Sequence, residues 1–295
     1  MKKFAVITFF AFAILLSGCV SFFSMINYSP SPKIVDVSFS DDINPSYRFV
    51  YSDTAGNEYL RKLRVNYGLD TLTQKANSEY EKVLLILQWT RQQWNHSGSN
   101  QPQKSDAISI LEEAKTGKSF RCVEYGIVSA AALNSIGLPA RVIGLKTRDV
   151  EKVKYGAGHV AAEVYLPELR KWVFLDGQFN AIPVLNNVPL SAVEFKQAVQ
   201  NNNADLKIVS LNRTANETEK ANYLKFAAKY LFYFDATFDN RIGVAGPRLT
   251  INDKTKLTLV PLNVKNPTIF QRKYPIYFSE YTNSVKDFYQ VPVFN

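Results

Sequence analysis

The segment 117–145 constrains the fold more than any other part of the sequence. It reads GKSFRCVEYGIVSAAALNSIGLPARVIGL, and residues 120–135 are compatible with a helix that Gly137 can end and Pro139 cannot continue. Small side chains recur along one stripe of this helix, at Cys122, Gly126, Ser129 and Ala130. Because small side chains let backbones approach each other, the sequence predicts a buried helix with Cys122 in its first turn.

Three strand-like segments follow the helix, at residues 141–146, 159–166 and 171–176. In the second segment, residues 159, 161, 163 and 165 share one face, and residues 160, 162, 164 and 166 share the other. Pro167 and Glu168 form a turn, so the last two strands are predicted to pair as an antiparallel hairpin. A helix followed by an antiparallel sheet is the order of an α+β fold.

Two further helices are predicted before this segment. Ser78 and Glu81 have the spacing of a capping box and open a helix over 78–95. A second helix over 105–115 is stopped by Gly117, and the glycine, proline and amide residues between the two helices form a loop.

The C-terminal third is predicted to be mostly β. A second capping box, Ser191 with Glu194, starts a short helix, and the run NNNA at 201–204 marks a boundary. Beyond it, a helix over 217–231 leads into strand-like segments at residues 249–251, 256–260, 268–270 and 276–278. We therefore divide the chain into a first domain over 46–200 and an accessory β-rich region over 201–295.

The first residues have the pattern of a bacterial lipoprotein signal. Lys2 and Lys3 precede an apolar run that is shorter than the roughly 20 residues needed to cross a bilayer, and the run closes on Leu-Ser-Gly-Cys. This end resembles a lipobox, so residues 1–18 are predicted to be a cleaved signal peptide. Cys19 is predicted to carry lipid chains such as palmitate, with residues 19–45 as a tether. We therefore expect a membrane-anchored protein on the periplasmic or surface side of the bacterial cell envelope.

Charge and cysteine usage narrow the classes of partner and cofactor. Without Lys2 and Lys3 the formal net charge falls from +9 to +7, and the sequence has no block of five or more like charges and no nucleic-acid motif. Nucleic-acid binding is therefore not expected. Two histidines are too few for a Cys/His zinc site, and no metal or other cofactor is predicted. With Cys19 assigned to lipid, Cys122 has no disulfide partner in an oxidising compartment, which is typical of a nucleophile.

Three residues of the first domain have side chains suited to chemistry. A helix N-terminus favours the thiolate of Cys122, and its first N–H groups are able to receive the oxyanion formed when an amide carbonyl is attacked. His159 begins the second strand after a Gly-Ala-Gly lead-in, and histidine is suited to exchange the proton. Asp176 ends the third strand. If the two strands pair, its carboxylate fixes the tautomer of His159.

Three motifs in this order resemble those of the transglutaminase-like superfamily: segment 117–145, GHVAAEVYL at 158–166 and KWVFLDGQFN at 171–180. In that family a cysteine begins a helix that ends in a GLPAR-type turn, and a histidine and an aspartate follow on neighbouring strands. The resemblance implies a papain-like α+β core and attack on glutamine or other amide carbonyls through an acyl thioester. It implies the roles of nucleophile, base and orienting group for Cys122, His159 and Asp176.

The leading expectation is therefore an envelope-anchored cysteine hydrolase or acyltransferase that acts on proteins, peptides or peptidoglycan stems. The alternative is a non-catalytic lipoprotein that binds such a partner in the same cleft. The family often places a Gln, Trp or Tyr upstream as an oxyanion donor, and five candidates stay open: Gln88, Trp89, Gln93, Trp94 and His96. Arg121 and Glu124 beside the nucleophile are interpreted as a salt-bridged or solvated pair, and the aromatic run 230–234 as core.

Overall fold

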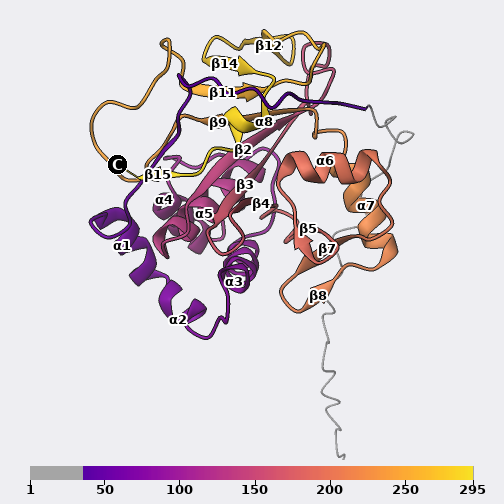
Figure 1. The fold of residues 1–295 in the computed structure, drawn as a ribbon. Coiled ribbons are helices and arrows are strands. Elements are labelled where there is room, and N and C mark those ends of the chain that lie inside the picture. The colour runs from indigo at the N-terminus through magenta and orange to yellow at the C-terminus, as the bar shows by residue number, and fades with distance from the viewer. Residues whose placement is uncertain (1–35, 295) are drawn as a thin grey trace, which may run out of the picture. The chain divides into compact units, whose positions relative to one another are not determined.

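Six strands form the central sheet, in the order β14-β11-β9-β2-β3-β4 (Figure 1). Their bounds are β2 (Ala140–Lys146), β3 (Gly158–Leu166), β4 (Lys171–Leu175), β9 (Tyr233–Thr237), β11 (Lys256–Leu259) and β14 (Ser279–Thr282). Neighbouring strands are antiparallel except β11 and β14, which are parallel. The predicted hairpin is confirmed, because β3 and β4 pair with Val164 opposite Val173.

The computed structural model describes residues 36–294. The predicted signal peptide, the predicted lipid attachment at Cys19 and the tether up to residue 35 lie outside these residues. Within the described part, no helix combines the length and the apolar character that a membrane crossing requires.

The helix that begins at Cys122, α5 (Cys122–Ser135), packs on β3 and β2 (Figure 1). A Cβ atom added at Gly126 would lie 2.9 Å from the carbonyl oxygen of Ala161 and 2.9 Å from a methyl carbon of Val160. The bare glycine therefore lets the helix lie directly on the strand, as the small-residue stripe predicts. Gly137 follows the helix with a φ of +87°, a conformation that favours glycine and ends the helix at the predicted place.

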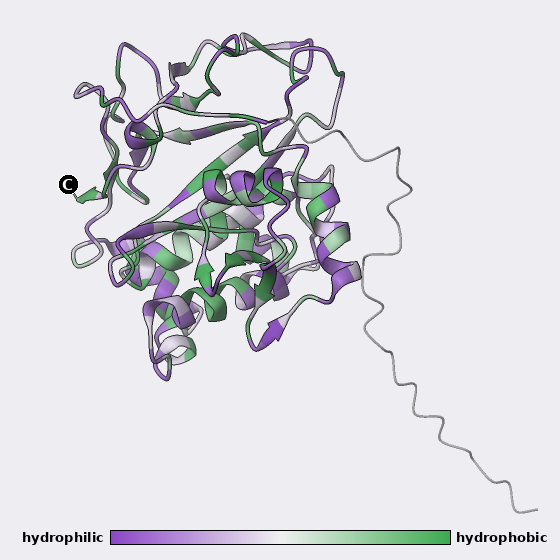
Figure 2. Cartoon of the chain, turned by 45° about the vertical axis from the view of Figure 1, so that its right-hand side comes forward, coloured by the Kyte–Doolittle hydropathy of each residue, from purple (hydrophilic) through white to green (hydrophobic). Residues whose placement is uncertain are grey.

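Four helices surround α5 on this face of the sheet: α1 (Glu58–Asn66), α2 (Leu69–Thr73), α3 (Glu79–Gln92) and α4 (Ala107–Lys115). Their apolar side chains share one core with α5 and with Ala162 and Val164 of β3. Ser78 Oγ accepts the N–H of Glu81 at 3.0 Å, which confirms the predicted start of α3. Figure 2 shows both hydrophobic and hydrophilic residues on these helices, the pattern of helices that cover a core.

The opposite face of β3 belongs to a second core. Ala161 and Tyr165 pack there with residues of α6 (Ala192–Gln200) and α7 (Glu217–Ala227). A small sheet has the order β6-β5-β7-β8. Two of its strands, β5 (Ile182–Leu185) and β6 (Val188–Pro189), precede α6 in the chain, and the other two, β7 (Leu206–Ser210) and β8 (Arg213–Thr214), lie between α6 and α7. The predicted alternation along β3 is confirmed, because successive residues enter two different cores.

The remaining elements are short. Two small sheets have the orders β10-β1-β15 and β12-β13, and one further helix, α8, precedes the end of the chain. Their bounds are β1 (Val50–Tyr51), β10 (Asp239–Asn240), β12 (Ile269–Phe270), β13 (Tyr274–Pro275), α8 (Val285–Phe288) and β15 (Val293–Phe294).

A buried ion pair holds the C-terminal segment on the sheet. Arg141 of β2 and Glu163 of β3 lie opposite each other with their side chains fully buried and 2.8 Å apart. The second guanidinium nitrogen of Arg141 donates to the carbonyl oxygen of Phe288 at 2.8 Å, and the Tyr289 hydroxyl donates to Glu163 at 2.9 Å. The pair thus satisfies its own hydrogen bonds and those of the segment around α8.

Three sequence predictions in the C-terminal third are wrong in detail. The helix predicted over 217–231 ends at Ala227, since Leu231 already pairs with Lys146 in a β-bridge. Segment 249–251 is not a strand, because the N–H of Leu249 donates to the Asp239 carboxylate. Segment 276–278 is irregular as well. The Phe278 carbonyl accepts from two successive N–H groups, and β14 begins only after it.

The boundary predicted after residue 200 follows α6 directly. The central sheet takes β2, β3 and β4 from one side of this boundary and β9, β11 and β14 from the other. The described residues all fall in one compact unit. The C-terminal strands therefore complete the sheet on which α5 packs.

Candidate active site

Cys122 is the first residue of α5 and has a free, half-buried thiol. The carboxylate of Glu124, which is fully buried, accepts the backbone N–H of Arg121 at 3.0 Å and pairs with the Arg121 guanidinium at 2.6 Å. This is the salt-bridged pair expected from the sequence. The first N–H groups of a helix have no acceptor within it, so those beside the thiol point to the site as donors.

His159 begins β3, directly opposite Leu145 of β2. Its Nε2 lies 2.8 Å from Oδ2 of Asp176, and its ring also forms a hydrogen bond with the side chain of Cys122. Since Asp176 occupies Nε2, the ring nitrogen left for the thiol is Nδ1. Burial lowers the pKa of His159, but the charge and hydrogen bond of Asp176 and the contact with Cys122 outweigh it and raise the pKa to about 10.

Asp176 follows β4 and is 1% exposed. Its Oδ1 accepts the N–H groups of Gln178 at 3.1 Å and Phe179 at 3.4 Å, so the turn after the strand fixes the carboxylate. Its Oδ2 accepts a second bond, from the hydroxyl of Tyr223 at 3.2 Å. Burial, together with the charge and hydrogen bond of Asp176, raises the pKa of Tyr223 well above its ordinary value, and the phenol therefore stays a donor.

Glycine at 177 lets this turn lie against α5. A Cβ atom at Gly177 would lie 2.9 Å from Oγ of Ser129 and 3.1 Å from Cβ of Tyr125. Gly126 and Gly177 thus bring the helix that carries the thiol close to both strands of the hairpin. The structure accordingly brings together the three residues predicted from the sequence.

Aromatic rings enclose the imidazole of His159, which is only 3% exposed. Phe226 of α7 lies edge-on at 5.1 Å between ring centroids, Tyr230 lies at 5.6 Å, and Phe179 at 6.3 Å. The sequence pattern indicates a core position for Tyr230 and gives no sign that Tyr223 or Phe226 lies at the site. The capping box of α7, in which Asn216 accepts from the N–H of Glu219, could have located the helix but not the side of the sheet that it covers.

The upstream residues left open from the sequence fall into two groups. Trp94 stacks on Tyr125 of α5 at 4.5 Å and meets Phe120 edge-on, and His96 forms a β-bridge with Phe120, two residues before the thiol. Burial, with the nearby charge of His159, lowers the pKa of His96. By contrast, Trp89 packs on Tyr67, and the Gln93 amide donates to the carbonyl oxygen of Trp89. Trp94 and His96 are therefore the pair beside the start of α5.

No cluster of three His, Cys, Asp or Glu side chains that could hold a metal ion occurs among residues 36–294. The site instead contains a thiol, an imidazole and a carboxylate, the set of side chains that nucleophilic attack on an acyl group needs.

Comparison with known proteins gives one family match, over part of the chain. Residues 69–177 match the model of the transglutaminase-like superfamily, and this range includes Cys122, His159 and Asp176. This part of the chain is therefore a transglutaminase-like core, as the sequence motifs indicated.

Three solved structures are similar in part. A candidate cysteine protease from Cytophaga hutchinsonii is 17% identical with a TM-score of 0.33, and the match covers 59% of this chain and 55% of that one. A TGase is 23% identical with a TM-score of 0.31, and the match covers 40% of this chain and 31% of that one. The periplasmic domain of TgpA from Pseudomonas aeruginosa is 20% identical with a TM-score of 0.31, and the match covers 43% of this chain and 44% of that one. The matched region is thus about half or less of each of these chains. A search of the curated proteins finds no match.

Proposed function

We propose that the protein is a cysteine enzyme that cleaves or transfers at amide carbonyls through a thioester on Cys122. One observation supports this above all others: the thiol, the His159 imidazole and the Asp176 carboxylate form a continuous hydrogen-bonded series at the start of a helix. A pKa of about 10 keeps the imidazole protonated at neutral pH, as a thiolate–imidazolium pair requires.

In the first step the Cys122 sulfur attacks the carbonyl carbon, and the carbonyl oxygen becomes an oxyanion facing the first N–H groups of α5. His159 then donates its proton to the leaving amine, the C–N bond breaks, and the acyl group stays on sulfur as a thioester. In the second step His159 accepts a proton from water or from an incoming amine, whose oxygen or nitrogen displaces the sulfur. Water gives a carboxylic acid, and an amine gives a new amide.

Asp176 orients the base in this proposal. Its bond to Nε2 turns Nδ1 toward the thiol and stabilises the charged ring through both steps. Tyr223 shares the same carboxylate oxygen and limits its movement, so it is a positioning residue rather than a catalytic one.

The proposed substrates are proteins, peptides or peptidoglycan stems. We also propose attachment through lipid at Cys19 and a place in the bacterial cell envelope, both from the sequence pattern at residues 16–19. A non-catalytic protein that binds the same partners is the second candidate, and the 3% exposure of His159 is the observation that favours it.

The experiment that separates the two candidates traps the acyl-enzyme. The full chain in detergent is incubated with an envelope extract and then digested, and the mass added at Cys122 is measured. An enzyme carries an acyl group at this position. The group should be absent from Cys122→Ala and strongly reduced in His159→Ala. A chain that acquires no acyl group, yet retains an envelope peptide without a covalent bond, is a binding protein.

Attachment of lipid is tested separately. Cells that express the full chain are fed an alkyne analogue of palmitate, and incorporation is read after coupling to a dye. The wild type should be labelled and Cys19→Ala should not. An unlabelled wild type rules out the anchor.

A further inference from the structure

A cavity of about 590 Å³ lies beside α5. This volume is within the range of ligand sites, roughly 300–1,000 Å³. Its floor is apolar and comes from α5, β2 and β3: Val123, Ile127, Ala131, Val142 and Val160. The segment around β10 forms the facing wall.

The cavity is next to the candidate active site but separate from it. Val123 directly follows Cys122 on α5, so one edge of the cavity adjoins the residue that carries the thiol, whereas Val160 faces α5 and lies on the opposite face of β3 from His159. None of the three proposed catalytic residues lines the cavity. A substrate whose amide lay at the thiol could therefore extend along α5 into this space.

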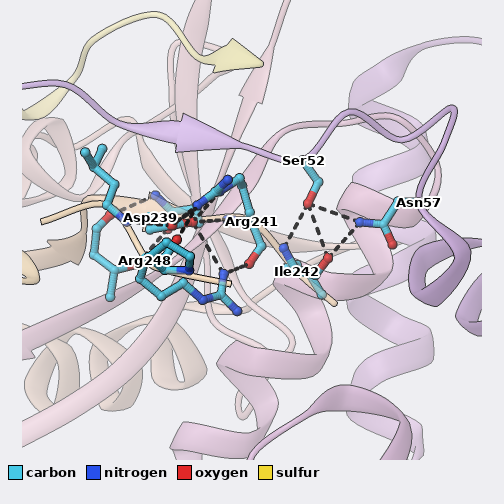
Figure 3. A network of polar contacts seen from close by, with 10 residues as sticks. Ser52, Asn57, Asp239, Arg241, Ile242 and Arg248 are labelled. Atoms are coloured by element: carbon cyan, nitrogen blue, oxygen red, sulfur yellow. Dashed lines mark hydrogen bonds and ion pairs between the residues drawn. The ribbon is translucent and has the colours of Figure 1, made fainter. Parts of the chain in front are cut away.

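Two arginines on the facing wall share one carboxylate. Asp239 pairs with Arg241 at 2.6 Å and with Arg248 at 3.4 Å (Figure 3). The Arg248 side chain is 46% exposed. The single negative charge of Asp239 is thus shared by two arginines, and Arg248 is bound to it more weakly than Arg241 is.

Two lysines share a second carboxylate. Asp235 pairs with Lys256, which lines the cavity, at 2.7 Å, and with the buried Lys146. Gly144 of β2 has no side chain where the Asp235 carboxylate lies, so the glycine makes room for this group. The only other acid on the lining is Asp106. It caps α4 by accepting from Ser109 and also accepts from Tyr59, so its oxygens already have donors within the protein, although its negative charge remains.

The arginine wall is held in place before any ligand binds. Ser52 Oγ accepts the N–H of Ile242 at 2.8 Å, and Asn57 donates to the carbonyl oxygen of Ile242 at 2.7 Å (Figure 3). Since a preorganised site loses less entropy on binding, fixed cations over an apolar floor favour a ligand that is both anionic and partly apolar.

We propose that this cavity binds an acidic segment of the peptide substrate next to the amide that Cys122 attacks. The carboxylate of the segment pairs with Arg248, Arg241 and Lys256, and its apolar neighbours pack on the floor. The inference rests on the proposed function and adds to it the class of substrate, an acidic peptide. Electrostatic pairing at a half-exposed wall also makes the interaction sensitive to salt.

The test measures binding without chemistry. The full chain carrying Cys122→Ala, in detergent, is titrated into rhodamine-labelled peptides Ala-Glu-Gln-Ala, Ala-Gln-Glu-Ala and Ala-Gln-Gln-Ala, all amidated at the C-terminus, and fluorescence anisotropy gives Kd. The glutamate side chain is then the only carboxylate in the first two peptides. We expect at least one of them to bind about fivefold or more tightly than the third, and the difference to shrink as salt is raised.

Matched variants locate the effect. Arg248→Gln and Lys256→Gln should each remove most of the preference for glutamate, and Lys256→Gln leaves Asp235 paired with Lys146. Arg213→Gln is the matched control. It breaks an ion pair as well, between Arg213 and Glu219, but it lies on β8 and does not line the cavity, so it should leave the preference for glutamate unchanged. Equal affinity for all three peptides, no binding of any, or a preference that survives both cavity variants would overturn the inference.

The two proposals fail in different ways. If the glutamate preference is present but Cys122 acquires no acyl group from any extract, the proposed function is wrong and the acidic-peptide site stands. If Cys122 is acylated but the acyl groups and the peptide affinities show no acidic preference, the inference is wrong and the enzyme stands.

Discussion

At the scale of single residues, the candidate site depends on one buried carboxylate that has four hydrogen-bond partners. Asp176 holds the imidazole of His159 with one oxygen, shares that oxygen with Tyr223, and is fixed by backbone N–H groups through the other. Such an arrangement sets the orientation of the base more tightly than a single contact would. Replacements that keep the shape of these side chains therefore test their roles with the least disturbance of the fold.

Asp176→Asn should lower the rate of acylation substantially, by up to about ten-thousandfold. The reason is that an amide neither stabilises the imidazolium of His159 nor holds the ring in its productive tautomer. The rate is read as thioester formed at Cys122 per unit time. Thermal unfolding should show a folded protein, which separates the loss of rate from a loss of structure. A variant that keeps the wild-type rate would remove Asp176 from the mechanism.

Tyr223→Phe should lower the rate more modestly, roughly tenfold, and destabilise the fold by about 1 kcal/mol, the contribution of one hydrogen bond. A positioning role also changes the pH dependence of acylation, whereas a purely structural role does not. The matched control is Tyr289→Phe, which removes a tyrosine hydroxyl bound to a buried carboxylate, Glu163, away from the site. An unchanged pH profile in Tyr223→Phe would contradict the positioning role.

The raised pKa of His159 predicts a dependence of stability on pH. Because the folded pKa of about 10 lies above the ordinary value of 6.5, the protonated ring stabilises the native state fully below pH 6.5. This contribution is lost as the pH rises from 6.5 toward 10. Urea unfolding of the wild type and His159→Gln should thus show a difference in the free energy of unfolding that shrinks over this range. A constant difference would mean that folding does not raise the pKa of the ring.

At the scale of elements, the contact between α5 and β3 sets the position of the thiol. Gly126 is inside a helix, where alanine is ordinarily more favourable by about 1 kcal/mol. Its backbone nevertheless lies so close to the Ala161 carbonyl that a methyl group does not fit without movement. The packing of the two elements therefore outweighs the helix propensity of the residue.

Gly126→Ala should destabilise the protein by about 1–3 kcal/mol despite the gain in helix propensity, because the strand backbone cannot yield as a flexible side chain would. Denaturant unfolding measures the change. Gly98→Ala is the control, since a Cβ atom there meets nothing within 4 Å, and it should be neutral within about 0.5 kcal/mol. A neutral Gly126→Ala would show that α5 and β3 are farther apart than described.

At the scale of the whole molecule, the central sheet and the surroundings of the candidate site are built from residues far apart in the chain. The central sheet needs β9, β11 and β14 to extend β2, and the wall around His159 needs α7. The Arg141 and Glu163 pair joins the centre of the sheet to the segment around α8. We therefore expect the C-terminal third to stabilise the catalytic core rather than to fold apart from it.

Arg141→Met should destabilise the whole protein by about 3–5 kcal/mol, because it leaves the buried Glu163 without its cation. The double variant Arg141→Met with Glu163→Gln should recover part of this loss, since the uncompensated charge is then gone. Chemical denaturation followed by both tryptophan fluorescence and circular dichroism should give one cooperative transition for each protein. Two separate transitions would mean that the C-terminal third unfolds independently.

Local sequence patterns predict the local parts of this protein. Helix α5 with its start at Cys122, the β3–β4 hairpin and the two faces of β3 follow from periodicity, capping and turn residues, which act over a few positions. The order of Cys122, His159 and Asp176 likewise indicated the superfamily before any geometry was known.

Only the tertiary structure decided which distant segments meet. Tyr223 and Phe226 reach the site from α7, and Arg248 and Lys256 reach the cavity from beyond residue 200. These contacts cannot be predicted from the local sequence pattern. The pattern of an amphipathic helix or of a strand shows which face is buried, but it does not show which other element packs on that face. The free energy that decides which elements pack together comes from burial and charge pairing across the whole core. These contacts form only after the long loops between the elements have closed.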